Sequence, residues 1–294
     1  MKIKLMVLPI LMHVAIIICG QDANSNTTEK VVFLFAHGIA DSGQQAYNKY
    51  AKTAPTQDGR YIVNPRYIID EPIITFDFPD AQSWLAKKIK VDFTRTSLAQ
   101  ENEIHALLMA YKETRTKHPD AKIVLVGLSR GASTILNFVA LHNPENIIAL
   151  VLESPFDAFS TAVEDRVKSR LARFCIRKAM DKKLFFWKHD TNRLNPIDLV
   201  HKIRIDMPIL FICSEQEMTV PMASSERLTQ KLIETGHTDI YLLKLKYGKH
   251  AHLLAGLDGN IYQRTAHAFY REYNIPHDPQ LANEGHPILA KCQK

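Results

Sequence analysis

The sequence has 294 residues, 46% hydrophobic and 23% charged, which suits one large globular domain and excludes disordered and collagen-like chains. The formal net charge is +6. It falls by two, to +4, if Lys2 and Lys4 leave with a targeting segment, and so small and diffuse a charge argues against a nucleic-acid partner.

The first twenty residues have the layout of a secretory signal. Two lysines precede an apolar run over Leu5–Ile18, and polar residues follow over Gln21–Lys30. The run is short for a membrane span, so residues 1–20 are predicted to be a signal peptide and residues 21–30 a linker. Export to the periplasm or outside the cell is expected. A chain anchored in the membrane by this segment is the alternative, and a lipid on Cys19 stays open.

After the linker, short apolar runs alternate with longer amphipathic stretches. Continuous apolar runs of strand length predict strands buried on both faces of a sheet. These runs lie at Val31–Ala36, Ile73–Phe76, Lys122–Val126, Ile147–Leu152, Met207–Cys213 and Ile240–Leu245. Helical periodicity predicts helices at Ser97–Lys117, Ala132–Leu141, Ser224–Thr235 and Ile261–Tyr273.

The first of these helices is expected to begin at Ser97. Ser97 and Gln100 match a capping box, in which a serine and a glutamine bond each other's backbone N–H groups. Strands that alternate with helices predict a mostly parallel, doubly wound α/β sheet. In such a sheet, reactive side chains gather beyond the carboxyl ends of the strands.

The strongest chemical signal is the sequence G-L-S-R-G at Gly127–Gly131, directly between a predicted strand and a predicted helix. A serine on so sharp a turn projects its hydroxyl above the sheet, and its neighbours must be small because two backbones come close. The start of the helix also favours developing negative charge. Ser129 is therefore predicted to be a nucleophile.

On this motif and its setting, the chain resembles the α/β-hydrolase superfamily over about Val31–Tyr273. The resemblance implies an α/β-hydrolase domain at 31–275, with a small helical cap inserted at about 155–206 and a C-terminal tail at 276–294. It implies a serine hydrolase that needs no metal and no organic cofactor.

The same resemblance implies an oxyanion hole. Family members often open this loop with His-Gly, and F-A-H-G-I-A-D at Phe35–Asp41 stands in the corresponding place. The backbone N–H groups of Ile39 and Arg130 would then hold the oxyanion. His37 itself is expected to support the loop and not to transfer protons.

The family's acid is commonly an aspartate three residues before a Val-Pro pair. In this chain Glu217 falls at that position, before Val220 and Pro221. Glutamate is a known variant of the acid and is longer by one methylene. Glu217 is therefore the predicted acid, and Glu215 is the second candidate.

The family's base lies on the loop after the last strand. His250 follows Gly248 by two residues and is the predicted base, with His252 as the alternate. The order Ser129, Glu217, His250 is that of α/β-hydrolases. His250 and His252 also form a His-x-His pair, but no motif supplies a third ligand, so no metal site is predicted.

The predicted cap has an apolar stripe and a basic remainder. Val163, Val167, Leu171 and Phe174 fall on one helical face, and the run Leu184–Trp187 follows. Basic residues crowd the other faces: Arg166, Lys168, Arg170, Arg173, Arg177 and Lys178. A helix packed over the sheet with a solvated basic face is the simpler interpretation. The alternative is a lid that selects anionic substrates or contacts an acidic membrane surface.

The predicted reaction is hydrolysis of an ester, thioester or amide through an acyl-enzyme on Ser129. A small-molecule or lipid-like acyl substrate is the first expectation, and a serine peptidase related to the prolyl-oligopeptidase type is the second. The competing hypothesis is a non-catalytic relative that uses its pocket for binding. Two features leave room for it: glutamate stands where the family commonly has aspartate, and two histidines, His250 and His252, lie where one base is expected. No obligate protein partner is inferred.

Overall fold

A computed structural model describes residues 30–39, 41–55, 61–70, 72–81, 97–167, 169–181 and 193–294. The predicted signal peptide lies outside the described residues, as do the linker up to Glu29, Lys168 and the run Leu184–Trp187. Within the described ranges, no helix has both the length and the apolar character needed to cross a bilayer.

The centre of the fold is a six-stranded sheet in which all neighbouring strands are parallel. Its order is β4-β1-β5-β6-β7-β8. The strands are β1 (Val31–Ala36), β4 (Ile73–Thr75), β5 (Lys122–Leu128), β6 (Ile147–Glu153), β7 (Ile209–Ser214) and β8 (Ile240–Leu245). They coincide closely with the apolar runs, so the predicted mostly parallel α/β sheet is confirmed.

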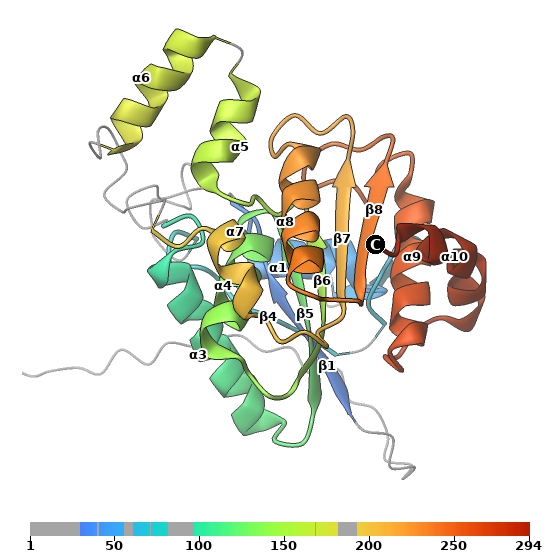
Figure 1. The fold of residues 1–294 in the computed structure, drawn as a ribbon. Coiled ribbons are helices and arrows are strands. Elements are labelled where there is room, and N and C mark those ends of the chain that lie inside the picture. Colours follow the sequence, from blue (N-terminus) through green and yellow to red (C-terminus); the bar gives the residue numbers. More distant parts are fainter. Residues whose placement is uncertain are drawn as a thin grey trace, which may run out of the picture.

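Helices cover both faces of the sheet (Figure 1). One layer contains α3 (Glu101–Lys117), α4 (Arg130–His142) and α8 (Met222–Glu234), and the other contains α1 (Gly43–Tyr50), α9 (Gly259–Glu272) and α10 (Pro279–Cys292). Alternate strand residues face the two layers: Phe33 and Val124 join the cluster under α9, whereas Leu34 and Leu125 join the cluster under α4. Two-sided burial is the reason that the strand sequences are continuously apolar.

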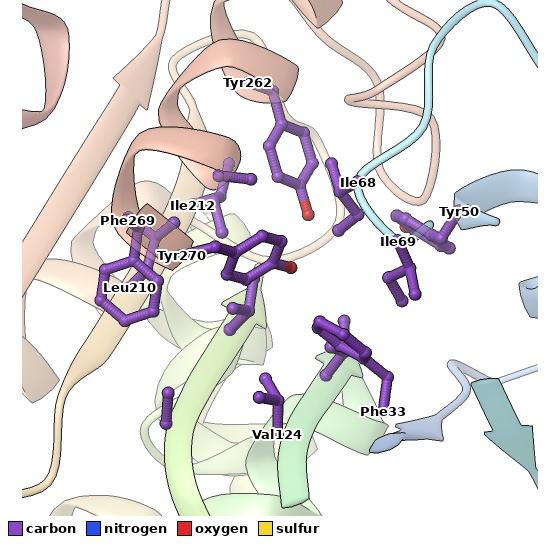
Figure 2. Packing of buried hydrophobic residues seen from close by; sticks show 14 of the residues in the cluster. Phe33, Tyr50, Ile68, Ile69, Val124, Leu210, Ile212, Tyr262, Phe269 and Tyr270 are labelled. Carbon is purple, nitrogen blue, oxygen red and sulfur yellow. The ribbon is translucent and has the colours of Figure 1, made fainter. Parts of the chain in front are cut away.

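Aromatic side chains dominate the core beneath α9 (Figure 2). Tyr262, Phe269 and Tyr270 point from α9 toward the sheet, where Phe33 meets the Tyr270 ring edge-on at a centroid distance of 5.4 Å. Tyr50, from the end of α1, closes the same cluster. This layer therefore carries several buried phenol groups, each of which favours a polar partner inside an otherwise apolar core.

The predicted helix start at Ser97 is wrong. Helix α3 begins at Glu101, and its N-cap Gln100 makes no side-chain capping bond. Ser97 donates its backbone N–H (2.8 Å) and its hydroxyl to the carboxylate of Glu103, which has no exposed surface. Because a buried carboxylate needs donors, the preceding segment wraps around it, with Leu98 at a positive φ of 54°. That bend excludes helical geometry.

The cap differs from the predicted continuous helix. It contains α5 (Phe159–Arg166) and α6 (Arg170–Asp181), separated by extended backbone at Val167. Leu171 is 73% exposed and Phe174 is 58% exposed, and α6 projects from the body of the molecule (Figure 1). The expectation that this stripe packs over the sheet is therefore wrong for α6. The alternative, a lid that meets anionic substrates or a membrane surface, stays a prediction.

Several short elements were not predicted, among them α1. After α1, the strands β2 (Thr53–Pro55) and β3 (Tyr61–Val63) form an antiparallel hairpin. At the end of the predicted cap insertion, helix α7 (Pro196–Leu199) and the 3₁₀ helix η1 (Val200–Lys202) return the chain to the sheet.

The C-terminal tail forms α10, which packs on α9. Gly285 makes this packing close, since a Cβ there would overlap with the carbonyl oxygen of Arg264. Leu289 and Cys292 join the core, and the Lys294 backbone N–H donates to the Ile240 carbonyl (3.0 Å). The tail is therefore tied to the edge of the sheet at β8.

Candidate active site

Ser129 occupies a strained turn between β5 and α4. Its backbone has φ 53° and ψ −116°, a region that non-glycine residues rarely adopt. A hydrogen bond holds it there, because its N–H donates to the Glu153 carbonyl (2.7 Å). The backbone of Gly131 lies so close to the Ala36 carbonyl oxygen that a Cβ at Gly131 would overlap with that oxygen. A Cβ at Gly127 would lie 2.7 Å from the Ala132 Cα. The two flanking glycines thus let three backbone segments meet at the serine.

Three side chains from distant loops form one hydrogen-bonded chain at this turn. Nε2 of His250 lies 2.9 Å from Oγ of Ser129, and Nδ1 of His250 bonds Oε1 of Glu217. Because a carboxylate can only accept, Nδ1 carries the hydrogen and the lone pair on Nε2 faces the serine hydroxyl. The His250 side chain is 16% exposed and the Glu217 side chain is fully buried. The arrangement can therefore move a proton from Ser129 to His250.

Glu217 is itself held by its neighbours. Oε1 accepts the backbone N–H of Val220 (2.9 Å), and Oε2 accepts the hydroxyl of Ser154. Ser154 follows β6 at a positive φ of 50°, and its N–H donates to the Ile212 carbonyl (2.8 Å). These bonds fix a glutamate side chain that has one more rotatable bond than aspartate. Sequence reasoning missed Ser154, whose only local signal is its place just past a strand end.

The two alternates lie elsewhere. Glu215 is exposed on the same loop as Glu217, and its backbone N–H donates to the Leu245 carbonyl (2.9 Å). His252 is also exposed and lines a groove beside the loop. Within the described ranges, Glu217 and His250 are thus the carboxylate and imidazole joined to Ser129 by hydrogen bonds.

The loop after β1 is supported from within by His37. This side chain is fully buried; its Nδ1 donates to the Gly38 carbonyl (2.8 Å) and its Nε2 accepts the Phe78 N–H (3.0 Å). Burial, reinforced by the charge of Arg130, lowers the pKa of His37 to about 3. The ring therefore stays neutral and braces the loop that carries Ile39, which lies half-buried in the turn directly after Gly38.

Arg130 clamps this loop to the serine turn. As the first residue of α4, it contributes a backbone N–H from the first turn, where such groups lack partners inside the helix. Its side chain, 1% exposed, donates to the Gly38 carbonyl (3.0 Å) and pairs with Asp80 (2.7 Å) and, at 3.7 Å, Glu103. The guanidinium also lies 4.5 Å from the ring centroid of Phe78. This buried ion cluster was missed, because its partners are far apart in the sequence.

A groove of about 1110 Å³ adjoins the loop that carries His250. Its walls come from α1, from the β2–β3 hairpin and the segment directly after it, and from Ala251, His252, Leu254 and Ala255 of the loop. Ile62 and Val63, more than half exposed, supply apolar surface, and Lys49 and Arg66 supply positive charge. The groove therefore offers a partly apolar wall with positive charge beside it.

Comparison with known proteins shows the fold. No family model and no curated protein matches the sequence. Among solved structures, esterase Pf2001 from Pyrococcus furiosus is similar at a TM-score of 0.53 and 13% identity, with 83% of this chain and 84% of that chain covered. The chain has the α/β-hydrolase fold.

A longer protein shares this fold. Acylaminoacyl peptidase from Pyrococcus horikoshii matches at a TM-score of 0.52 and 18% identity over 87% of this chain. The present chain, however, spans only 39% of that peptidase. At such identities the α/β-hydrolase fold is shared, and the reaction has to be argued from the residues of the site.

Proposed function

We propose that the protein is a serine hydrolase that cleaves an ester, thioester or amide bond through an acyl-enzyme on Ser129. The observation that carries this proposal is the chain of hydrogen bonds from Ser129 through His250 to the buried Glu217. A nucleophile bonded to a base that is oriented by a third group is the arrangement that nucleophilic catalysis requires.

The proposed reaction has two halves. His250 takes the proton of Ser129 at Nε2 while Oγ bonds to the carbonyl carbon, and the backbone N–H groups of Ile39 and Arg130 stabilise the resulting oxyanion. When the carbonyl re-forms, the leaving group departs with the proton from His250. Water then attacks the acyl-enzyme with His250 again as base, which releases the acid and restores Ser129.

Glu217→Gln is expected to lower kcat/KM by about 10⁴-fold, because the charge that stabilises the imidazolium and fixes its tautomer is lost. Steady-state hydrolysis of an activated ester measures this. Glu215→Gln, on the same loop, is the matched control and should stay within about twofold of wild type. Equal losses in Glu215→Gln and Glu217→Gln would contradict the assignment of the acid.

We propose a lipid-like acyl chain as the occupant of the groove, in keeping with its apolar hairpin wall and its place beside the catalytic loop. Val63→Asp is expected to lower kcat/KM for a long-chain p-nitrophenyl ester by at least about tenfold, since loss of apolar contact with a few methylenes costs about 1–3 kcal/mol. The acetyl ester, too short to reach the wall, should be unaffected. Met109→Asp, an exposed apolar residue on α3, is the control. Equal losses on both esters would contradict this substrate assignment.

A peptidase is the second candidate, favoured by the shared fold with the acylaminoacyl peptidase. An aminoacyl anilide assayed beside a graded series of p-nitrophenyl esters and a thioester separates the two. Esters cleaved with the higher kcat/KM support the first proposal, and preference for the anilide supports the second. If folded protein turns over none of these substrates, a non-catalytic binding protein becomes the better account.

A further inference from the structure

We propose that the groove beside the His250 loop selects an acyl substrate whose chain carries an anionic group, a carboxylate or a phosphate, and that Arg66 binds this group. The inference rests on the proposed function and deepens it, because it names the class of acyl chain that the same site accepts.

The lining of the groove has an unbalanced charge. Among the described residues that line it, none is acidic, whereas Lys49 and Arg66 are basic. The ammonium group of Lys49 lies 2.8 Å from the carboxylate of Asp41, so its charge is already compensated. Arg66 forms no ion pair with any residue that the structure describes. The uncompensated positive charge of the groove is therefore that of Arg66.

Backbone acceptors fix the position of Arg66. Its Nη1 donates to the carbonyl oxygens of Gly256 (2.6 Å) and Ala255 (3.2 Å), on the loop that carries His250. Its backbone N–H donates to Oδ1 of Asn64 (3.1 Å), and Nδ2 of Asn64 donates to the Lys49 carbonyl (2.8 Å). Both ends of the side chain are thus anchored before a ligand arrives, which lowers the entropic cost of binding.

Arg66 retains donors for a ligand. A guanidinium has five N–H donors in a fixed fork, and those of Nη1 serve the two carbonyls. Within the described ranges, neither Nε nor Nη2 of Arg66 has a hydrogen-bond acceptor. The fork of a guanidinium matches two oxygens of a carboxylate or a phosphate, and such charge-assisted bonds are stronger than neutral ones. An anionic group is therefore the ligand that fits this side chain.

An apolar wall lies directly before this cation in the sequence. Ile62 and Val63, both more than half exposed, line the groove from β3, and Arg66 follows three residues later. A neutral lipid would cover the guanidinium without a counter-charge, and a small anion would leave the apolar wall in water. A molecule with an apolar chain and an anionic group satisfies both features.

The test compares two p-nitrophenyl esters of equal length. One is the mono-p-nitrophenyl ester of a dicarboxylic acid, and the other is the same compound with its free carboxylate capped as a methyl ester. A series from hexanedioate to hexadecanedioate lets the carboxylate reach Arg66 in at least one member. In that member, wild-type kcat/KM is expected to favour the anionic ester by about tenfold or more. No preference at any length would overturn the proposal.

Arg66→Gln is expected to abolish this preference. Because Arg66 also holds the His250 loop, kcat/KM for both esters can fall, so the readout is the ratio of the two values. A ratio that stays at the wild-type value would show that Arg66 only supports the loop, and would overturn the proposal. Arg115→Gln is the matched control: Arg115 also donates to a backbone carbonyl, that of Ala121 (3.4 Å), but lies on α3 in the opposite helix layer. Its ratio should equal that of wild type.

Arg66→Lys is the second variant, for the case in which Arg66→Gln does not fold. Lysine keeps the positive charge but lacks the planar fork, so the ratio is expected to lie between those of wild type and Arg66→Gln. A ratio unchanged from wild type would contradict recognition by the guanidinium.

Direct binding supplies a readout that does not depend on turnover. Calorimetric titration of the full chain with decanoate, decyl phosphate or decanol, each below its micellar concentration, should show the anions binding at least about tenfold more tightly than decanol. Arg66→Gln should remove that difference, and the tighter anion identifies carboxylate or phosphate. Equal affinity for all three probes would overturn the proposal.

The two readouts separate this inference from the proposed function. If no turnover depends on Ser129 while anion binding depends on Arg66, the proposed function fails and the groove is a binding site for an anionic amphiphile. If turnover depends on Ser129 but neither the ester preference nor the binding depends on Arg66, the inference fails alone.

Discussion

Replacement of Ser129 by alanine is expected to lower kcat on an activated ester by about 10⁶-fold, the loss seen when the nucleophile of a serine hydrolase triad is removed. The reason is geometric: Oγ of Ser129 is the atom that lies 2.9 Å from Nε2 of His250, and alanine leaves the base with nothing to activate. The residual rate, about 10³–10⁴ above that in water, would come from binding and the oxyanion donors. Steady-state kinetics with a sensitive fluorogenic ester measures both values.

The stability of Ser129→Ala shows whether its activity is lost because the nucleophile is missing or because the protein is unfolded. Alanine has the same backbone restrictions as serine at a φ of 53°. The free energy of unfolding of Ser129→Ala should therefore be close to that of wild type. Ser129→Gly should be equally inactive but more stable by about 1 kcal/mol, because glycine adopts positive φ without strain. Activity in Ser129→Ala within about tenfold of wild type would contradict the assignment of the nucleophile.

Arg130→Met is expected to lower the free energy of unfolding by about 3–5 kcal/mol, the range observed when one partner of a buried ion pair is removed. Methionine fills much of the space but leaves Asp80 and Glu103 buried without the opposite charge. The bond to the Gly38 carbonyl is lost as well, so the loop that carries Ile39 should move and activity should fall. Urea denaturation of both proteins at neutral pH measures the difference in stability.

A triple variant shows whether the loss comes from uncompensated charge. Asp80→Asn and Glu103→Gln, added to Arg130→Met, remove the negative charges while keeping the shapes of the side chains. The free energy of unfolding should then be higher than that of Arg130→Met alone, because the effects of substitutions within one ion network are not additive. A triple variant whose loss equals the sum of the single losses would contradict the coupling.

The elements that sequence reasoning predicted well are those whose signal is local. Val31–Ala36 and Ile240–Leu245 are strands in the structure with the same ends as the apolar runs, because burial on both faces leaves almost no polar position inside them. The exception is Lys244, which is exposed near the end of β8 and pairs with Glu226. The turn at Gly127–Gly131 was equally readable, since two backbones meet there and only glycine fits.

The features that sequence reasoning missed depend on contacts between distant segments. Ser97 matches a capping box locally, yet Glu103 takes its hydrogen bonds because that carboxylate is buried beside Arg130. Glu153 directly follows the predicted strand Ile147–Leu152, and its hydrogen bond from Tyr50 on α1 forms only when the chain folds. The spacing of residues within one segment does not predict a hydrogen-bond partner that lies far away in the sequence.

The central claim is that the hydroxyl of Ser129 is a nucleophile activated by His250. The most direct measurement is labelling of the folded, full-length protein with a fluorophosphonate, followed by mass spectrometry of the peptides. The account predicts one label per chain on Ser129, none in Ser129→Ala, and labelling slowed by several orders of magnitude in His250→Ala. A folded protein that takes no label, or that carries it on another residue, would contradict the account.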